Sequence, residues 1–275
     1  MTRLEIDGLA LNVEQQGAGP PIVLLHGFTG SATTWRRLTE VLSPSFEVIA
    51  FDLVGHGQSD SPEPVDRYRM RRCTDDLVAA LRTLGHARAI WLGYSLGGRT
   101  ALQVAAHHAD AVSALVLEGA TPGLEDRDER AARVASDEVL AERLEREGLE
   151  AFIDFWESIP LWDTQAGLPS ETVAAVREQR MANTVTGLAN SLRGMGTGAQ
   201  EPVHDRLPEI GVPTLLLTGA LDQKFTAIGE RMAAAMPRAE RCVVPGAGHA
   251  VHLEDPNAFE SAVVEFSTRV AVHSS

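Results

Sequence analysis

The sequence predicts an α/β fold with a mostly parallel central sheet, helices on both faces and an inserted helical cap. Short apolar runs typical of buried strands alternate along the chain with amphipathic helical stretches, which is the pattern of a parallel sheet. This alternation stops between residues 123 and 210, where the sequence is helical and charged and contains no buried strand. We therefore expect a core made of residues 1–122 and 211–275, with residues 123–210 forming the cap.

Before the cap, the chain is expected to form a hairpin followed by four buried strands. The hairpin strands, at residues 4–6 and 9–13, flank Asp7-Gly8, a dipeptide that favours a tight turn between antiparallel strands. Apolar runs predict the buried strands at residues 21–25, 46–51, 89–93 and 112–117. Apolar residues at helical spacing predict helices at residues 34–42, 70–84 and 96–107.

The cap is expected to contain helical stretches at residues 125–146, 149–158 and 171–192. We interpret most of its alternating acids and arginines as a solvated, salt-bridged helical face. The glycine-rich run 194–198 follows no strand, so we interpret it as a flexible return to the core and not as a phosphate-binding loop.

After the cap, the parallel pattern resumes with strands at residues 213–217 and 241–244 and a helix at residues 227–236. Asp255 is expected to cap the closing helix, with Pro256 at its first position.

The central motif of the chain is Gly93-x-Ser95-x-Gly97, which joins a predicted strand to a predicted helix. A sharp strand-to-helix turn needs small residues where the two elements approach, because a Cβ atom there would clash. Such a turn would present the Ser95 hydroxyl at the carboxyl edge of the sheet. Taken alone, the motif is equally consistent with a glycine-rich turn that carries an incidental serine.

Two residues with complementary chemistry, Asp222 and His249, follow later strands of the predicted sheet. Active sites of open parallel sheets lie at the carboxyl ends of strands, so both side chains belong at the same edge as Ser95. A serine needs an imidazole to take its proton, and the imidazole needs a carboxylate to fix its tautomer. The chain order Ser, Asp, His is that of the α/β-hydrolase fold. We predict that these residues form a catalytic triad, with Glu118 as the alternative acid.

The loop after the first buried strand, His26-Gly27-Phe28, is expected to help form an oxyanion hole. In this fold the donors are backbone N–H groups, here those of Phe28 and of Leu96, the residue after the serine. We interpret His26 as a structural residue that ties its own loop. We assign no catalytic role to His56 or His252.

Arg99 lies four residues after Ser95 and therefore projects from the same face of the predicted helix. A cation in the first helical turn opposes the helix dipole, at a cost of roughly 0.3–1 kcal/mol. This position favours an anion-binding arginine beside the serine; the alternative is a salt bridge to a nearby acid.

The formal net charge of −14 disfavours a nucleic-acid partner and an anionic membrane surface. It would also repel an anionic substrate, which would then need local arginines. Cys73 and Cys242 show no metal-ligand spacing, and we expect reduced thiols, no metal and no cofactor. The first residues show no apolar targeting segment, and no run approaches the length of a membrane span. We expect a cytoplasmic protein without membrane insertion; its oligomeric state stays open.

Four short segments carry a more specific signal: Gly-Tyr-Ser-Leu-Gly-Gly-Arg at 93–99, Glu-Gly-Ala-Thr-Pro-Gly-Leu at 118–124, Glu-Arg-Ala-Ala-Arg at 129–133 and Asp-Gln-Lys-Phe at 222–225. With them, nearly the whole chain resembles the 2-succinyl-6-hydroxy-2,4-cyclohexadiene-1-carboxylate synthase (MenH) family of menaquinone, or vitamin K2, biosynthesis. The resemblance implies a lyase that eliminates pyruvate from 2-succinyl-5-enolpyruvyl-6-hydroxy-3-cyclohexene-1-carboxylate. In this reaction the triad removes a carbon-bound proton, with the serine oxygen as the base, and no acyl-enzyme is required.

The resemblance also implies which residues bind this small polycarboxylate. Guanidinium groups suit carboxylates because they pair with them through two parallel hydrogen bonds. The matching positions are three carboxylate-binding arginines, Arg99, Arg133 (with Arg130 as the neighbouring alternative) and Arg180, and two pocket residues, Tyr94 and Trp156.

Two other function classes stay open at this point. A serine hydrolase, either a carboxylesterase or a carbon–carbon bond hydrolase, would use the same triad and oxyanion hole. A non-catalytic small-molecule receptor could keep the fold without turnover. The arginines discriminate the lyase from the hydrolase, and reaction of Ser95 with a phosphonate or sulfonyl fluoride probe discriminates an enzyme from the receptor.

Overall fold

The computed structural model describes residues 2–272. The predicted core segments also include residues 1 and 273–275, which lie outside the described part of the chain. Within residues 2–272, eight strands form one sheet in the order β1-β2-β4-β3-β5-β6-β7-β8. They are β1 (Thr2–Ile6), β2 (Leu9–Gln16), β3 (Pro21–Leu25), β4 (Glu47–Phe51), β5 (Ala89–Tyr94), β6 (Val112–Glu118), β7 (Thr214–Gly219) and β8 (Ala239–Val244).

The sheet is mostly parallel, as predicted. β1 pairs with β2, and β2 with β4, in antiparallel fashion, while the remaining neighbours run parallel. Both residues of the hairpin turn, Asp7 and Gly8, have positive φ angles of 47° and 72°, as a tight turn between antiparallel strands requires. The predicted strands match the observed ones to within three residues at each end.

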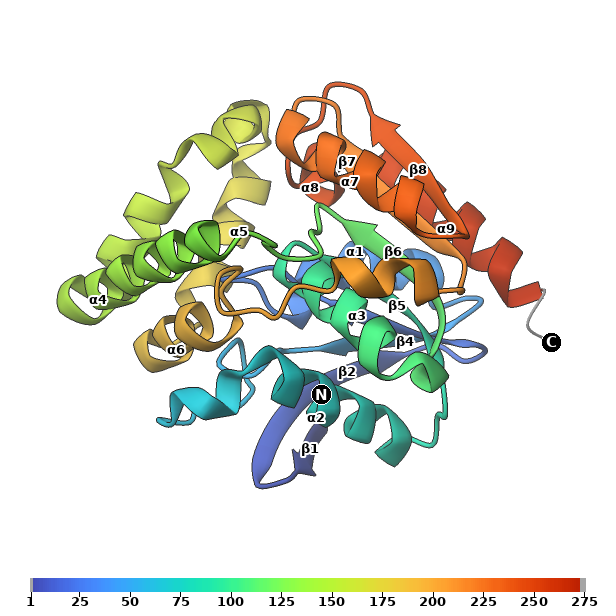
Figure 1. Ribbon diagram of the computed structural model, residues 1–275, viewed down its shortest axis with the longest axis horizontal. Helices are drawn as coiled ribbons and strands as arrows, with labels where there is room; N and C mark the ends of the chain where they lie inside the picture. The colour runs from blue at the N-terminus through green and yellow to red at the C-terminus, as the bar shows by residue number, and fades with distance from the viewer. Residues whose placement is uncertain (1, 273–275) are drawn as a thin grey trace.

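Helices cover both faces of the sheet (Figure 1). Helices α2 (Met70–Thr83), α3 (Leu96–His107) and α7 (Gln223–Ala235) contribute to one buried cluster, together with Val23 and Leu25 of β3. The other cluster contains residues of α1 (Arg36–Leu42) and α9 (Pro256–Val272), together with Ile22 and Leu24. Successive residues of β3 thus point to opposite faces, which is why this buried strand reads as a continuous apolar run.

Three longer helices lie between β6 and β7, in the segment where no strand was predicted. They are α4 (Arg127–Glu157), α5 (Ser170–Met181) and α6 (Val185–Met195), and they lie together at the left of Figure 1. Gly148 interrupts the helical geometry of α4 with a φ of 82°, between the two stretches predicted there. Their apolar faces form a separate buried cluster that includes Leu144, Phe152 and Leu188.

The helix predicted at residues 171–192 is wrong as one element, because the chain breaks between α5 and α6. The Asn183 side chain donates to the carbonyl of Thr29 (2.9 Å) and accepts from the N–H of Gly57 (3.1 Å). Thr184 then caps α6 by accepting from the N–H of Gly187. These contacts with distant loops outweigh the continuous local helical pattern.

Short helices complete the described chain: η1 (Ala32–Trp35), η2 (Val65–Tyr68), η3 (Ala109–Ala111), η4 (Pro160–Gly167), η5 (His204–Glu209) and α8 (Val251–Glu254). At the start of α9, Asp255 accepts from the N–H of Ala258 and Pro256 is the first helical residue, which confirms the predicted cap.

The glycine-rich run 194–198 is closely packed, which corrects the expectation of a flexible return. A Cβ atom on Gly194 would lie 2.6 Å from Cβ of Tyr68, and one on Gly198 would lie 2.7 Å from the carbonyl oxygen of Arg130. The glycines therefore serve close approach of the backbone to α4 and η2.

Candidate active site

Ser95 occupies a strained turn between β5 and α3. Its φ of 50° and ψ of −106° fall in a region that residues with a side chain rarely adopt. A Cβ atom on Gly93 would lie 2.2 Å from the carbonyl oxygen of Gly97, and one on Gly97 would lie 2.1 Å from that of Leu25. Both are closer than any Cβ contact allows, so these two glycines permit the turn that displays the serine.

The side chains of Ser95, His249 and Asp222 form a hydrogen-bonded chain. Asp222 Oδ2 lies 2.7 Å from His249 Nδ1, and His249 Nε2 lies 3.2 Å from Ser95 Oγ. An ionised carboxylate only accepts, so Nδ1 carries the proton and Nε2 is left to accept from the serine hydroxyl. This arrangement suits transfer of a proton from Ser95 to His249.

Asp222 has two tasks, because its other oxygen, Oδ1, caps α7 by accepting from the N–H of Phe225 (3.1 Å). This cap explains why α7 begins four residues before the predicted helix. Burial of Asp222 tends to raise the pKa of its carboxyl, but hydrogen bonds from His249 and Phe225 hold that pKa below its usual range. The carboxylate is therefore charged beside the imidazole.

The loop of His249 is held by a carboxylate that sequence reasoning did not single out. Glu254 accepts from the N–H groups of Gly248 (2.6 Å) and Ala250 (3.3 Å), the residues on either side of the histidine. Glu118, the alternative acid, accepts instead from the backbone N–H and Nδ1 of His252, at 3.0 Å and 2.9 Å. The histidine bonded to Ser95 therefore has Asp222 as its carboxylate partner.

His26 ties its own loop, as predicted. His26 Nε2 accepts from the N–H of Leu53 (3.0 Å), and its Nδ1 lies 2.7 Å from the carbonyl oxygen of Gly27. Burial lowers the pKa of His26 to about 4, and the pKa of His56, which is also buried, to about 3. Both imidazole rings are therefore uncharged near neutral pH, and their hydrogen bonds to backbone groups hold the loops after β3 and β4.

Ser95 and His249 face a cavity of about 340 Å³ that is lined from both sides. The core contributes Ser95, His249 and both residues with predicted oxyanion-hole N–H groups, Phe28 and Leu96. The segment between β6 and β7 contributes Arg133, Leu140, Trp156, Leu161, Trp162, Ser191, Leu192, Met195, Gly196 and Thr197. Side chains from the Ser95–His249 side and from the segment between β6 and β7 thus enclose one space.

Arg99 lines this cavity and is buried, with 8% of its surface exposed. One guanidinium nitrogen donates to the carbonyl of Met195 (2.8 Å) and to Oε1 of Gln200 (2.6 Å). The structure gives no ion pair for Arg99 within residues 2–272, so the salt-bridge alternative is not what holds it. Burial and the nearby charge of Arg133 lower its pKa from the usual value, so a bound anion would relieve an electrostatic cost.

Of the other residues implied by the family resemblance, Arg133, Tyr94 and Trp156 also line the cavity. Tyr94 Oη and Trp156 Nε1 are buried and lack a hydrogen-bond partner among the described residues. Buried hydrogen-bond donors are nearly always paired in proteins, so these two groups indicate that a ligand provides acceptors. A ligand rich in carboxylate and ether oxygens would supply them.

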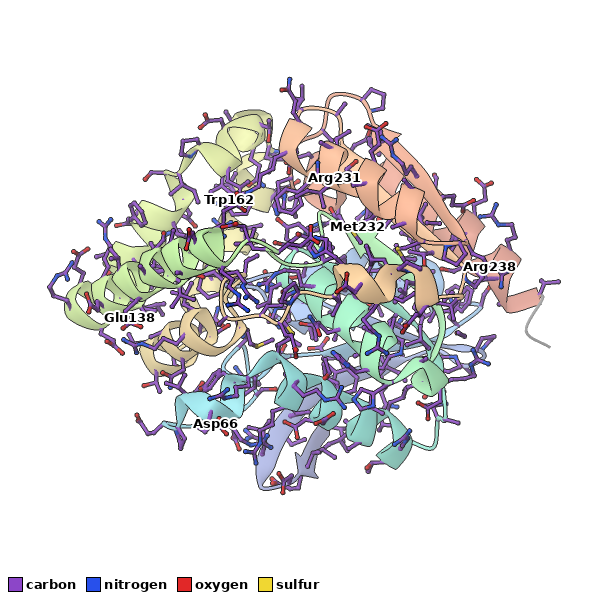
Figure 2. All side chains as sticks on the ribbon, viewed as in Figure 1. Asp66, Glu138, Trp162, Arg231, Met232 and Arg238 are labelled. Atoms are coloured by element: carbon purple, nitrogen blue, oxygen red, sulfur yellow. The ribbon has the colours of Figure 1, made fainter. Side chains whose placement is uncertain are left out.

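Among the lining residues that sequence reasoning missed are Lys224, Trp162 and Ser191. Lys224 lies in the Asp-Gln-Lys-Phe run at 222–225, so its place two residues after the triad acid could have revealed it. Trp162 belongs to η4, which no predicted element covered; Figure 2 labels it. Its Nε1 and Ser191 Oγ add two more buried groups without a partner in the described chain.

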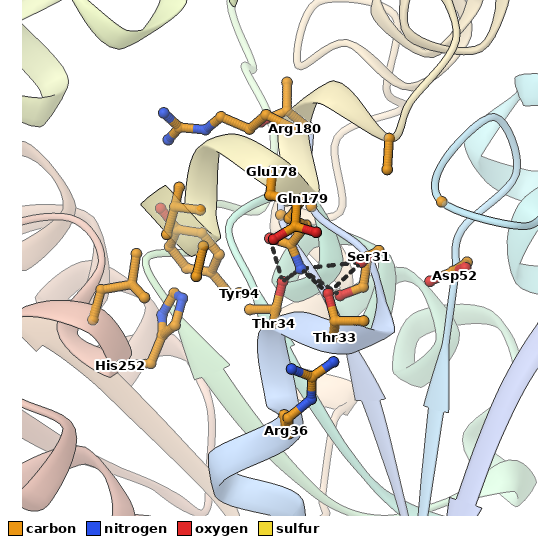
Figure 3. A pocket seen from close by; sticks show the side chains of 18 of the residues that line it. Ser31, Thr33, Thr34, Arg36, Asp52, Tyr94, Glu178, Gln179, Arg180 and His252 are labelled. Atoms are coloured by element: carbon orange, nitrogen blue, oxygen red, sulfur yellow. Dashed lines mark hydrogen bonds between the residues drawn. The ribbon is translucent and has the colours of Figure 1, made fainter. Parts of the chain in front are cut away.

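Arg180 does not line the cavity of Ser95. It lines a neighbouring cavity of about 740 Å³ that shares Phe28, Tyr94 and Trp162 with the first. In Figure 3, Arg180 and Gln179 come from the same helix, and Gln179 Nε2 donates to Ser31, Thr33 and Thr34 of the core. The Arg180 guanidinium lies 3.2 Å from Glu157, and its central carbon lies over the ring of Trp162, 5.3 Å from the ring centroid. Its predicted contact with the substrate stays a prediction.

Comparison with known proteins agrees with this fold. A family model described as the alpha/beta hydrolase fold matches residues 20–256. A Bacillus subtilis (strain 168) protein, named provisionally as a 2-succinyl-6-hydroxy-2,4-cyclohexadiene-1-carboxylate synthase, is 42% identical over 96% of this chain and 97% of its own. A Serratia proteamaculans (strain 568) protein named as the same synthase is 33% identical over 94% of this chain and 98% of its own. Among solved structures, MenH from S. aureus superposes with a TM-score of 0.90 at 31% identity, covering 94% of this chain and 98% of that one.

The fold and the Ser-His-Asp arrangement define an enzyme of the α/β-hydrolase superfamily. Within that superfamily, similarity over nearly the full length of both chains narrows the assignment. The chain belongs to the 2-succinyl-6-hydroxy-2,4-cyclohexadiene-1-carboxylate synthase (MenH) family.

Proposed function

We propose that this protein is a carbon–oxygen lyase of menaquinone biosynthesis. It eliminates pyruvate from 2-succinyl-5-enolpyruvyl-6-hydroxy-3-cyclohexene-1-carboxylate and yields 2-succinyl-6-hydroxy-2,4-cyclohexadiene-1-carboxylate, the product named for its relatives. The observation that carries the proposal is that Ser95 and His249 share one enclosed cavity with Arg99 and Arg133. A base and paired cations in one space suit proton removal from a carboxylate-rich molecule.

In the proposed reaction, Ser95 Oγ removes a carbon-bound proton from the ring while His249 Nε2 holds the proton of the serine. The electron pair of the broken carbon–hydrogen bond forms the new ring double bond. The carbon–oxygen bond to the enolpyruvyl group breaks, and its electron pair leaves with the oxygen. Protonation of the released enolate gives pyruvate, so the step consumes neither water nor an oxidant. Asp222 stabilises the charge that His249 gains.

The remaining site residues would bind and orient the substrate. Backbone N–H groups of Phe28 and Leu96 would stabilise the negative charge that develops on oxygen, each worth roughly 2.7–4 kcal/mol in the transition state. Arg99 and Arg133 would hold two carboxylates, with Tyr94 and Trp156 packing around the ring. Arg180 would act from the neighbouring cavity.

The proposal also covers the architecture and setting of the enzyme. Residues 123–210 would form a cap over the site, and residues 1–122 and 211–275 would form the catalytic core. Within residues 2–272, no helix combines the length and the apolar character that a membrane span requires. We place the protein in the cytoplasm, acting on a small molecule.

The test is to supply the enolpyruvyl precursor and to measure pyruvate by a coupled dehydrogenase assay. The intact enzyme should release pyruvate, and Ser95→Ala should lower kcat by about 10³-fold or more, as loss of a triad member does elsewhere. A precursor that stays intact with the unmodified enzyme would refute the lyase assignment.

Ester hydrolysis is the second candidate, favoured by the same hydrogen-bonded Ser95, His249 and Asp222. A thermophilic esterase from Thermogutta terrifontis shares the fold, with a TM-score of 0.86 at 28% identity over 98% of this chain and 100% of that one. Hydrolysis of a neutral ester together with no pyruvate release would favour this function. Failure of Ser95 to react with a sulfonyl fluoride, without turnover of any substrate, would favour a binding protein.

A further inference from the structure

The two arginines that line the cavity are held in different ways. Arg99 is buried, and backbone and amide oxygens fix its guanidinium. Arg133 lies on α4 with 42% of its side chain exposed, and its Nε donates to Oδ1 of Asp137, one helical turn further on, at 2.8 Å. An exposed arginine loses rotamer freedom when it binds a ligand, so a partner that already restricts it favours binding.

The Asp137 carboxylate is buried, although the other partner of its ion pair on the helix is exposed. Only 3% of its side chain is exposed, it is not among the residues that line the cavity, and its Oδ2 is buried without a hydrogen-bond partner in the described chain. Burial raises the pKa of this carboxyl, whereas the charges of Arg133 and Arg99 oppose that shift. A buried carboxylate with a spare oxygen is costly, and the two guanidinium groups are the charges that offset the cost.

The glycine-rich run 194–198 is the surface against which this arrangement packs. A Cβ atom on Gly196 would lie 2.4 Å from Oδ2 of Asp137, and one on Gly198 would lie 3.0 Å from Cβ of Arg133. Met195 lies in the same run, and its carbonyl oxygen accepts a hydrogen bond from the Arg99 guanidinium. One turn of the chain therefore contacts Arg99, Arg133 and Asp137.

We propose that Asp137, seated against the run 194–198, is a positioning residue that aims the Arg133 guanidinium into the cavity and offsets its repulsion with Arg99. Asp137 leaves the outer nitrogens of Arg133 available for a carboxylate of the ligand. The inference rests on the proposed function, because it takes the ligand to be a polycarboxylate.

The alternative is that Asp137 acts only as a negative charge near the site. The two accounts predict opposite changes in the anion affinity of Asp137→Ala. If only charge matters, removal of the carboxylate leaves a more positive cavity, so anions bind more tightly to both Asp137→Ala and Asp137→Asn. If position matters, Asp137→Ala binds anions more weakly, whereas Asp137→Asn keeps an acceptor for Nε and retains most of the affinity.

The experiment measures the Kd of benzene-1,3,5-tricarboxylate by calorimetry, with the uncharged benzene-1,3,5-tricarboxamide as a control ligand. Asp137→Ala should raise the Kd of the tricarboxylate about tenfold, and Asp137→Asn should change it less than about threefold. The chain offers a matched control on the same helix, because Arg143 Nε donates to Glu147 at the same spacing and 2.7 Å. Neither member of that pair lines the cavity, so Glu147→Ala should leave the Kd unchanged.

A second pair of variants tests the packing of Asp137 against the run 194–198 without changing the carboxylate. Gly196→Ala places a methyl group 2.3 Å from the carbonyl oxygen of Leu192 and 2.4 Å from Oδ2 of Asp137, and it should weaken binding in the same direction as Asp137→Ala. Because Gly196 also lines the cavity, the loss must be confined to the tricarboxylate; an equal loss with the tricarboxamide would mean that the methyl group only fills the cavity. Gly167→Ala is its control, since no atom lies within 4 Å of a Cβ atom there. Circular dichroism melts define a temperature at which all variants are folded.

Unchanged or tighter binding by Asp137→Ala overturns the inference, as does an equal loss in Glu147→Ala. Failure of the intact protein to bind the tricarboxylate overturns it as well. These outcomes are separate from failure of the proposed function, because the probe reports binding and needs no turnover. If pyruvate release is absent while Asp137→Ala still weakens binding, the lyase assignment fails and the positioning role stands.

Discussion

The core and the proposed cap, residues 123–210, hold their parts of the candidate site by different means. In the core, backbone conformation and bonds between side chains and the backbone fix the proposed reactive groups. Ser95 is fixed by its turn, Asp222 by its hydrogen bond from the first turn of α7, and the loop of His249 by the two hydrogen bonds that Glu254 accepts from backbone N–H groups. In the cap, side-chain pairs do this work, such as Arg133 with Asp137 and Arg180 with Glu157.

The difference matches what each half has to do. A backbone turn cannot relax by rotation of a side chain, so Ser95 and His249 keep their relative positions in the absence of ligand. Each of these ion pairs has one partly exposed member, the Arg133 side chain at 42% and the Glu157 side chain at 25%, and solvent screening weakens such pairs. We therefore expect the proposed reactive groups to be in place before a ligand binds, whereas two of the three arginines proposed to bind the ligand, Arg133 and Arg180, are held by side-chain ion pairs.

The largest expected effect comes from the turn in the core. Gly97→Ala would place a Cβ atom 2.1 Å from the carbonyl oxygen of Leu25, where only backbone could move. We expect a loss of about 4 kcal/mol or more in the free energy of unfolding, measured by urea titration. Gly167→Ala in the cap should change it by less than about 0.5 kcal/mol. Equal stability of the two variants would break the contrast between the halves.

Arg99 should give the largest effect on substrate binding, because we propose that this core residue binds a carboxylate of the substrate. Arg99→Ala should raise KM for the enolpyruvyl substrate roughly 100-fold, within the range of about 2–5 kcal/mol for loss of a buried charged partner. Hydrolysis of a neutral test ester should be largely retained. Equal loss of both activities would count against an anion-specific role. Arg99→Lys should give a KM between those of the unmodified enzyme and Arg99→Ala, because lysine keeps the charge but cannot form two parallel hydrogen bonds with a carboxylate.

Acid should destabilise the core loops through His26, which is fully buried and whose pKa is lowered to about 4. Between pH 6.5 and 4 the unfolded chain binds the proton and the folded chain does not, so stability falls as the pH falls. The full effect is about 3 kcal/mol, from 1.36 kcal/mol for each pKa unit. Urea titrations across this range should show a shallower slope for His26→Asn; parallel slopes would contradict the assignment.

The smallest effect is expected in the cap. Arg180 lines the neighbouring cavity and is already engaged by Glu157, so Arg180→Ala should raise KM less than tenfold, or about 1 kcal/mol. Steady-state kinetics with the enolpyruvyl substrate measure this. A loss as large as that of Arg99→Ala would show that the cap rearranges around the ligand and brings Arg180 to the reacting groups.

The sequence by itself determined the sheet and the meeting of three polar side chains at its carboxyl edge. Carboxyl ends of parallel strands meet at one edge of a sheet, so the places of Ser95, Asp222 and His249 after their strands were enough to bring them together. Gly93 and Gly97 marked the turn for the same local reason, since steric limits on the backbone depend on neighbours in sequence. The approach of Arg99 to the site followed from helical spacing.

Only the tertiary structure decided the cap. The break at Asn183 depends on Thr29 and Gly57, which are far away in sequence, and no local pattern encodes such contacts. The same holds for Arg180, whose cavity is set by how α5 docks on the core, and for the run 194–198, whose glycines are explained by α4 and η2 packing against them. Local periodicity fixes an element and the face it buries, but which charged side chains meet across two elements depends on how those elements pack.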